Sequence, residues 1–182
     1  MSQTVELSSL DMRFEAYRLR DKAREARLLA SIAERGIEQP LEGVDTRQGI
    51  LLLDGFKRWR CARTLSIQRV PYVSLGTDEA EAIVQLLGPA PHQSLNILEQ
   101  AKFVVELLSV HKLSQAEVAQ TLSRSKAWVS MRQDLLREMS AELQATLFRG
   151  GFPVYSYMYT RLDDASLTIP TWRDGKALAI ER

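Results

Sequence analysis

Apolar and polar positions follow different patterns before and after residue 88. In the first part, short aliphatic runs alternate with stretches in which apolar residues recur every three or four positions, which predicts strands alternating with helices. The run at residues 49–53 is apolar enough to lie inside a sheet, and Pro71 favours a sheet edge or a strand start. The expected strands are residues 4–7, 41–44, 49–53 and 69–75, and the expected helices are residues 21–35, 56–65 and 79–87.

The second part shows helical spacing alone. Asn96 with Glu99 marks a helix start, and the expected helices are residues 96–111, two shorter ones up to residue 137, residues 140–148 and the Tyr-rich residues 153–162. Two prolines and a glycine within residues 88–91 cannot continue either regular structure, so we place a linker there. The pattern predicts an α+β protein: a small mixed-sheet domain at 1–88, an all-α domain at 95–162 and a C-terminal tail at 163–182.

The composition limits which kinds of binding site the chain can form and which compartment it is expected in. The chain has 182 residues, of which 45% are apolar, so it can bury a core. Lys and Arg number 24 against 23 Asp and Glu, so any charge signal for a partner must be local. The single Cys61 excludes an intrachain disulfide and is expected to be an inert packed thiol. With only His92 and His111 as histidines, no metal site is expected; without a long apolar run, neither is a membrane span, and a cytoplasmic protein is expected.

Residues 113–137 predict two short helices joined by a tight turn. Ser114 with Glu117 forms a capping box, Ala119 is small where a second helix would cross, and Ser125 caps the next helix. This spacing is typical of a helix-turn-helix. Ser123 stands where the turn usually has glycine, at a cost of about 1 kcal/mol. The side chains expected to face inward are Val118, Leu122, Trp128, Val129, Met131, Leu135 and Leu136.

Polar side chains share the opposite side of the second helix and the turn before it. Short or donor-rich groups at this spacing can reach base edges and phosphates in a major groove. The alternative is an ordinary helical hairpin whose polar side faces water. The expected DNA-binding residues are Gln115, Arg124, Ser125, Lys126, Ala127, Ser130, Gln133 and Arg137.

A second basic segment opens the expected helix at 56–65. Lys57 and Arg58 fall in its first turn, where the helix dipole disfavours each cation by roughly 0.3 to 1 kcal/mol, so an anion is expected nearby. Gly55 lets the backbone approach a ligand closely, and Arg60 adds charge. This arrangement suits a phosphate group. The alternative is that Asp54 caps the helix and the basic side chains face water.

Four motifs in this order resemble the ParB family of chromosome and plasmid partition proteins. They are LASIAERGIEQP at 29–40, LDGFKRWRCA at 53–62, LNILEQA at 95–101, and LSQAEVA at 113–119 with SKAWVS at 125–130. The resemblance implies a ParB/sulfiredoxin-type domain that binds CTP, followed by a helix-turn-helix domain that reads a DNA site. It also implies double-stranded DNA, a ParA-type ATPase and a second copy of the chain as partners. The implied nucleotide-binding residues are Gly36 and Gln39 for the cytidine, and Gly55, Lys57, Arg58 and Arg60 for the triphosphate.

The chain departs from this family at two nucleotide motifs. Phe56 stands where the family has the glutamate associated with hydrolysis, and residues 85–89 lack the carboxylate and amide that would hold Mg²⁺. We therefore expect a degenerate CTP-binding domain, no Mg²⁺ and no catalytic residues. The alternatives are a CTP hydrolase or nuclease, and a transcriptional regulator or mobile-element accessory protein. The roughly twenty residues after the matched region are too few for the family's C-terminal dimerisation domain, which leaves the oligomeric state open.

Overall fold

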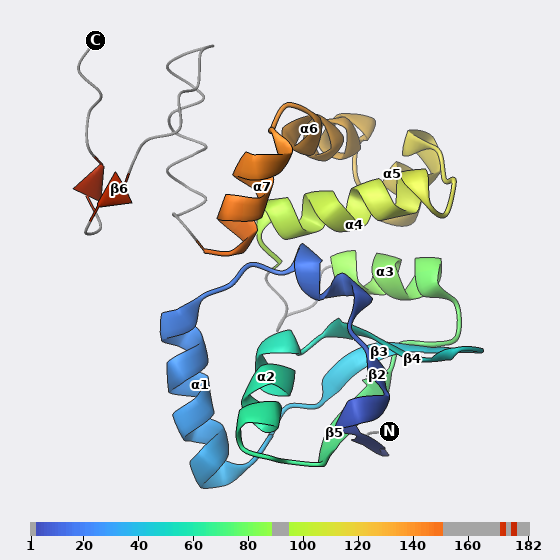
Figure 1. The fold of residues 1–182 in the computed structure, drawn as a ribbon. Helices are drawn as coiled ribbons and strands as arrows, with labels where there is room; N and C mark the ends of the chain where they lie inside the picture. The colour runs from blue at the N-terminus through green and yellow to red at the C-terminus, as the bar shows by residue number, and fades with distance from the viewer. Residues whose placement is uncertain (1–2, 89–94, 151–171, 174–175, 178–182) are drawn as a thin grey trace.

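The first part of the chain folds around a five-stranded mixed sheet. The computed structural model describes residues 3–88, 95–150, 172–173 and 176–177 (Figure 1). The strand order is β1-β5-β3-β4-β2, with antiparallel β1·β5 and β3·β4 pairs and parallel β3·β5 and β2·β4 pairs. The strands are β1 (Gln3–Glu6), β2 (Leu10–Asp11), β3 (Leu41–Thr46), β4 (Gly49–Asp54) and β5 (Arg69–Ser74). A mixed sheet in an α+β fold is therefore confirmed.

Pro71 does not lie in an edge strand, because β5 lies between β1 and β3. Pro71 pairs with Thr4 of β1, whereas the pairing of β5 with β3 begins one residue later, at Tyr72. The proline thus occupies the part of an inner strand that β3 does not reach. A residue without an N–H group is tolerated there because only one neighbouring strand needs bonding.

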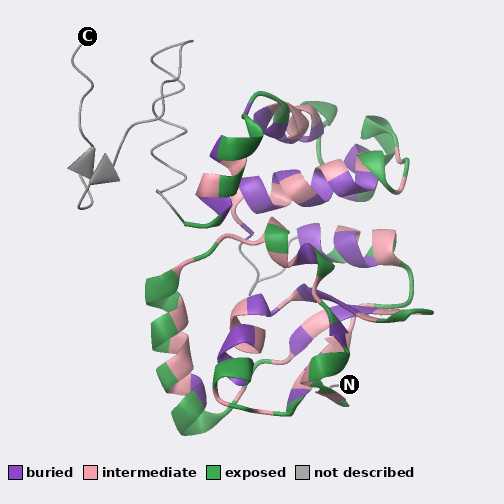
Figure 2. Ribbon diagram, viewed as in Figure 1, coloured by how far each residue is buried: buried purple, intermediate pink, exposed green. Residues whose placement is uncertain are grey.

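Three helices accompany this sheet and one of them connects it to the second part. They are α1 (Lys22–Arg35), α2 (Phe56–Thr64) and α3 (Glu79–Leu87). Asp21 and Asp78 cap α1 and α3, because each side chain accepts a hydrogen bond from the amide three positions later, that of Arg24 or Glu81. In Figure 1, α3 lies between the sheet and the later helices, and it contacts β3, β4 and α4. Figure 2 shows α1 largely exposed on its outer side.

Between residues 95 and 150 the structure has four helices, which are α4 (Ile97–Ser109), α5 (Gln115–Thr121), α6 (Lys126–Arg137) and α7 (Ala141–Phe148). Asn96, Ser114 and Ser125 cap α4, α5 and α6 as the sequence indicated, and Ser140 caps α7. The expected helix at 153–162 lies outside the described residues. The strands β6 (Trp172–Arg173) and β7 (Lys176–Ala177) pair in the predicted tail. Within the described residues, no helix is both long and apolar enough to cross a membrane.

A continuous apolar core joins the sheet to the helices. One cluster of buried residues runs from Leu10 through the sheet and α3 to Val129 of α6, and a second lies between α4, α6 and α7. The division into separate domains at residue 88 stays a prediction.

The segment after β1 also bridges the two parts, and the sequence did not predict its structure. It contains β2 and the short 3-10 helices η1 (Leu7–Ser9) and η2 (Arg13–Tyr17). Phe14 is fully buried, and its ring lies 5.1 Å from that of Tyr17 and 5.4 Å from that of Phe103 in α4. Elements of two to five residues are too short to show a hydrophobic period, so sequence pattern does not reveal them.

Candidate nucleic-acid interface

The two helices predicted at residues 113–137 are present with the expected caps. Ser114 and Glu117 form both hydrogen bonds of a capping box at the start of α5, and Ser125 accepts from the amide of Trp128 at the start of α6. Ser123 adopts a left-handed φ of 52°, and the Arg124 amide bonds the Ala119 carbonyl at 2.8 Å. The turn thus has the left-handed conformation expected of glycine, formed here by a serine.

The inward side of α6 differs from the prediction at one turn. Val118, Leu122 and Val129 are buried as expected, and Trp128 packs half-buried against the core. Met131, expected inside, is 60% exposed, and Arg132 is buried in its place. Position 132 lies one full turn after Trp128, on the side that faces α4. The pattern missed it because arginine is rarely buried.

Arg132 fastens α6 to α4 through neutral partners. Its Nε and Nη2 donate to Gln100 Oε1 at 2.9 and 2.8 Å, and its Nη1 donates to the Trp128 carbonyl at 3.2 Å. The guanidinium lies 3.5 Å from the centre of the Trp128 ring. Burial, together with the charge of Arg124, lowers the pKa of Arg132 to about 10. The group therefore fixes the orientation of α6 and adds positive charge behind it.

The predicted DNA-binding residues gather at the turn and along the outer side of α6. The side chains of Gln115, Arg124, Lys126 and Arg137 are exposed, as are Ser125 and Ala127, whereas Ser130 and Gln133 are half-buried. Gln115 Nε2 donates to Gln133 Oε1 at 2.6 Å, which ties the start of α5 to α6. The structure thus brings all eight together on α5, the turn and α6.

Asp134 is a member of this surface that the sequence analysis left out. Its carboxylate accepts from Ser130 Oγ at 3.1 Å and pairs with Arg137 Nη2 at 2.7 Å. Two of the predicted contact residues therefore bond a carboxylate of the same helix in the free protein. The signal was present in the sequence, since positions 130, 134 and 137 are spaced by four and three residues.

The predicted phosphate loop takes a different form from the one expected. Gly55 is the N-cap of α2, with φ of 99° and no side-chain cap, so Asp54 does not cap the helix. A Cβ on Gly55 would lie 2.8 Å from Leu41 Cγ, so the glycine permits close packing against the protein itself. Gly36 is the C-cap of α1 with φ of 75°, and Gln39 is exposed on the loop that follows.

The two arginines of this loop are engaged inside the protein. Arg58 donates to the carbonyls of Gln39 and Pro40 and pairs with Asp54 at 3.0 Å. Arg60 is buried and pairs with Glu15 and Glu25. Burial alone would lower the pKa of Arg60. The hydrogen bonds that its guanidinium donates to these two carboxylates outweigh this effect and raise the pKa of Arg60.

Lys57 differs from both arginines. It is half-exposed, and no ion pair holds it within the described part of the chain. Gly36, Gln39, Gly55 and Arg58 therefore share one region, but the cationic group there without an internal pair is Lys57. Cys61, on the same helix, is buried, and burial raises the pKa of its thiol, as expected for an unreactive cysteine.

Comparison with known proteins gives a consistent set of relatives. The chain is 30% identical to "Probable chromosome-partitioning protein ParB" of Coxiella burnetii, over 76% of this chain and 48% of that protein. It is 30% identical to the "Nucleoid occlusion protein" of Bacillus licheniformis, over 67% of this chain and 44% of that one. No model of a known protein family matches. The chain spans about half the length of these curated relatives.

A likeness to one solved structure is weaker. The C-terminally truncated ParB from Caulobacter crescentus, complexed with CTP-gamma-S, is 22% identical with a TM-score of 0.42, covering 86% of this chain and 89% of that one. The curated similarities extend over most of the present chain, and they agree with the ordered motifs of the sequence. The chain belongs to the ParB family of partition proteins.

Proposed function

We propose that the chain is a site-specific DNA-binding protein of chromosome or plasmid partition, and that α5 and α6 form its helix-turn-helix. The observation that carries the proposal is the outer side of α6, where Lys126, Ser130 and Arg137 share one side of a helix whose other side is in the core. A water-facing hairpin requires no such collection of donors. Membership of the ParB family supports the partition role.

In this proposal α6 enters the major groove with its N-terminal end near the phosphates. The amides of the first turn and the positive end of the helix dipole favour an anion there, and Arg124 and Lys126 add charge beside it. Gln115 donates to the side-chain oxygen of Gln133, Oε1, so Nε2 of Gln133 can donate to a base edge. Phosphate contacts would set the position, and the side chains farther along α6 would read the sequence.

The first prediction concerns affinity and its dependence on salt. The DNA site is obtained by selecting bound sequences from a random duplex pool, and binding to it is then measured by anisotropy across a salt series. Lys126→Ala and Arg137→Ala should each weaken binding, and loss of a phosphate contact should lower the salt slope by about one unit.

Arg149→Ala is the matched control, because Arg149 is an exposed cation that follows α7. Its affinity should equal that of the wild type. Unchanged affinity and slope in both α6 variants would contradict the proposal. A palindromic site would support binding by two copies. A recovered site that lies at promoters, with no ParA-type ATPase encoded nearby, would favour the transcriptional alternative.

CTP is the nucleotide that the family resemblance implies for the first part of the chain. The groups we propose to receive its phosphates are the amides at the start of α2 and Lys57, whose side chain is free of internal ion pairs within the described residues. Arg58 and Arg60 would have to leave their carboxylates, and Phe56 offers no group for hydrolysis. The proposal is therefore binding without turnover.

The second prediction tests this nucleotide site by equilibrium dialysis of radiolabelled CTP, with and without the selected DNA. Lys57→Ala should reduce CTP binding by roughly tenfold, the loss of one charge-assisted bond. Arg63→Ala, an exposed cation on the same helix that stacks on Trp59, should bind like the wild type. Release of CDP that vanishes in Arg58→Ala would instead favour the enzymatic alternative, and no CTP binding by the wild type would refute the proposed site.

A further inference from the structure

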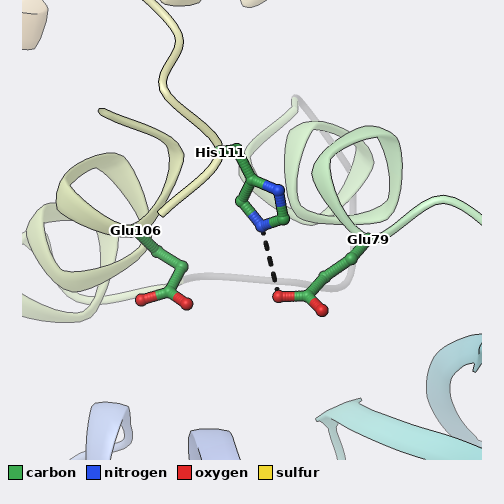
Figure 3. A group of neighbouring side chains, drawn as sticks. All are labelled: Glu79, Glu106 and His111. Carbon is green, nitrogen blue, oxygen red and sulfur yellow. Dashed lines mark hydrogen bonds and ion pairs between the residues drawn. The ribbon is translucent and has the colours of Figure 1, made fainter. Parts of the chain in front are cut away.

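Three side chains with metal-ligand chemistry converge where α3 meets α4. Glu79 opens α3, Glu106 lies in the last turns of α4, and His111 follows that helix. One ligand atom of each lies within 4.8 Å of those of the other two. Figure 3 shows the carboxylate of Glu106 directed toward that of Glu79, with the imidazole of His111 beside them.

The charge at this junction is not balanced from within the protein. Glu106 is only 6% exposed, and among the described residues no cation pairs with it. The hydroxyl of Tyr17 donates to its Oε2 at 2.6 Å. A buried carboxylate normally has a cationic partner, because desolvation disfavours an isolated charge. Here its neighbour is a second carboxylate, and like charges at this separation repel.

The other two groups are held in ligand-like orientations. Glu79 Oε2 pairs with Arg13 at 2.6 Å, while its Oε1 lies 3.2 Å from His111 Nε2. The Tyr17 hydroxyl donates to one carboxylate oxygen of Glu106. In known metal sites, hydrogen bonds to a ligating carboxylate fix its orientation. Burial, followed by the bond to Glu106, raises the pKa of Tyr17, so the hydroxyl keeps its proton to donate.

A surface cavity borders the cluster at Glu79. A cavity of about 260 Å³ is lined by Glu79, Arg13, Arg47 and Gln48, among others. Glu79 and His111 are each about one-fifth exposed, whereas Glu106 lies deeper. The three ligand atoms need to approach one another by about 1 Å to meet one ion with bonds near 2.1 Å, and side-chain rotation can supply this.

We propose that Glu79, Glu106 and His111 bind one divalent transition-metal cation of the Zn²⁺ type, which ties α3 to α4. Two carboxylate oxygens and one imidazole nitrogen are a ligand set for such ions, whereas Mg²⁺ and Ca²⁺ favour oxygen alone. The cation supplies the positive charge that Glu106 lacks. It would strengthen the junction between the sheet-bearing part of the chain and the helices that carry the proposed DNA surface.

The third prediction is a calorimetric titration of the whole 182-residue chain with ZnCl₂ alone. One Zn²⁺ should bind per chain, and the thermal midpoint should rise by roughly 5 to 10 °C at a hundredfold excess over Kd. Glu106→Gln and His111→Gln should each reduce affinity by at least roughly tenfold. Glu81→Gln, an exposed carboxylate on α3 outside the cluster, should bind like the wild type.

A second measurement does not depend on the folding of any variant of the cluster. The chain has two histidines, so the imidazole resonances of the wild type can be followed by NMR during the same titration, with His92→Gln used for assignment. The His111 resonance should shift at one equivalent of Zn²⁺. The proposal is overturned by a titration that leaves His111 unmoved, by the absence of saturable binding, or by a loss in Glu81→Gln equal to that in Glu106→Gln.

Discussion

At the scale of single residues, close packing explains features that a ligand was expected to explain. The sequence suggests that Gly55 admits a phosphate, yet the space beside it is filled by Leu41. The sequence also suggests a phosphate contact for Arg60, yet its guanidinium pairs with Glu15 and Glu25 inside the protein. A basic residue near a glycine can therefore bind a phosphate or pair with a carboxylate of the protein. Sequence alone does not decide between the two, because the paired carboxylates lie far away along the chain.

The fourth prediction separates backbone strain from packing at Gly55. Gly55→Ala should lower the free energy of unfolding by roughly 2 to 4 kcal/mol, because alanine at φ of 99° is strained and its Cβ would overlap Leu41. Gly36→Ala is the control, since Gly36 also has a positive φ but no atom within 4 Å of an added Cβ. It should cost roughly 1 to 3 kcal/mol from backbone strain alone, because its φ of 75° and ψ of −171° lie in a region that is essentially restricted to glycine. Urea denaturation measures both, and equal losses would show that contact with Leu41 is unimportant.

At the scale of elements, local capping signals were the reliable part of the sequence. Asn96, Ser114 and Ser125 each cap a helix, because the side-chain oxygen accepts from an amide that the helix itself leaves unbonded. The exchange of Met131 for Arg132 on the inner side of α6 was not predictable in this way. It depends on Gln100, which lies 32 positions earlier and supplies the acceptor.

The fifth prediction concerns the attachment of α6 to α4. Arg132→Ala should lower the free energy of unfolding by roughly 2 to 4 kcal/mol, because Gln100 Oε1 and the Trp128 carbonyl lose their donor and the Trp128 ring loses its cover. The exposed Arg124 also lies over Trp128, at 5.6 Å, and Arg124→Ala should cost less than about 1 kcal/mol. Denaturant unfolding followed by tryptophan fluorescence compares the two. A smaller loss in Arg132→Ala than in Arg124→Ala would be the contrary result.

At the scale of the whole molecule, pattern predicted the classes of element but not their assembly. The apolar run of β4 indicated an inner strand, and β4 does lie between β3 and β2. The meeting of Glu79, Glu106 and His111 had no sequence signal, because their closeness is created by the packing of α3 on α4. The predicted absence of a metal site followed from counting histidines and cysteines, a count that cannot detect carboxylates brought together by folding.

The short segment from Phe14 to Leu19 touches both halves of the chain. The ring of Phe14 packs on Phe103, Arg18 pairs with Asp54 at the end of β4 and with Glu99 in α4, and the Leu19 amide donates to Glu99. If either half unfolds first on heating, the aromatic and ionic contacts of this segment break, and the other half loses the same contacts. The two halves should therefore unfold as one cooperative unit, so a change that destabilises one half also destabilises the other.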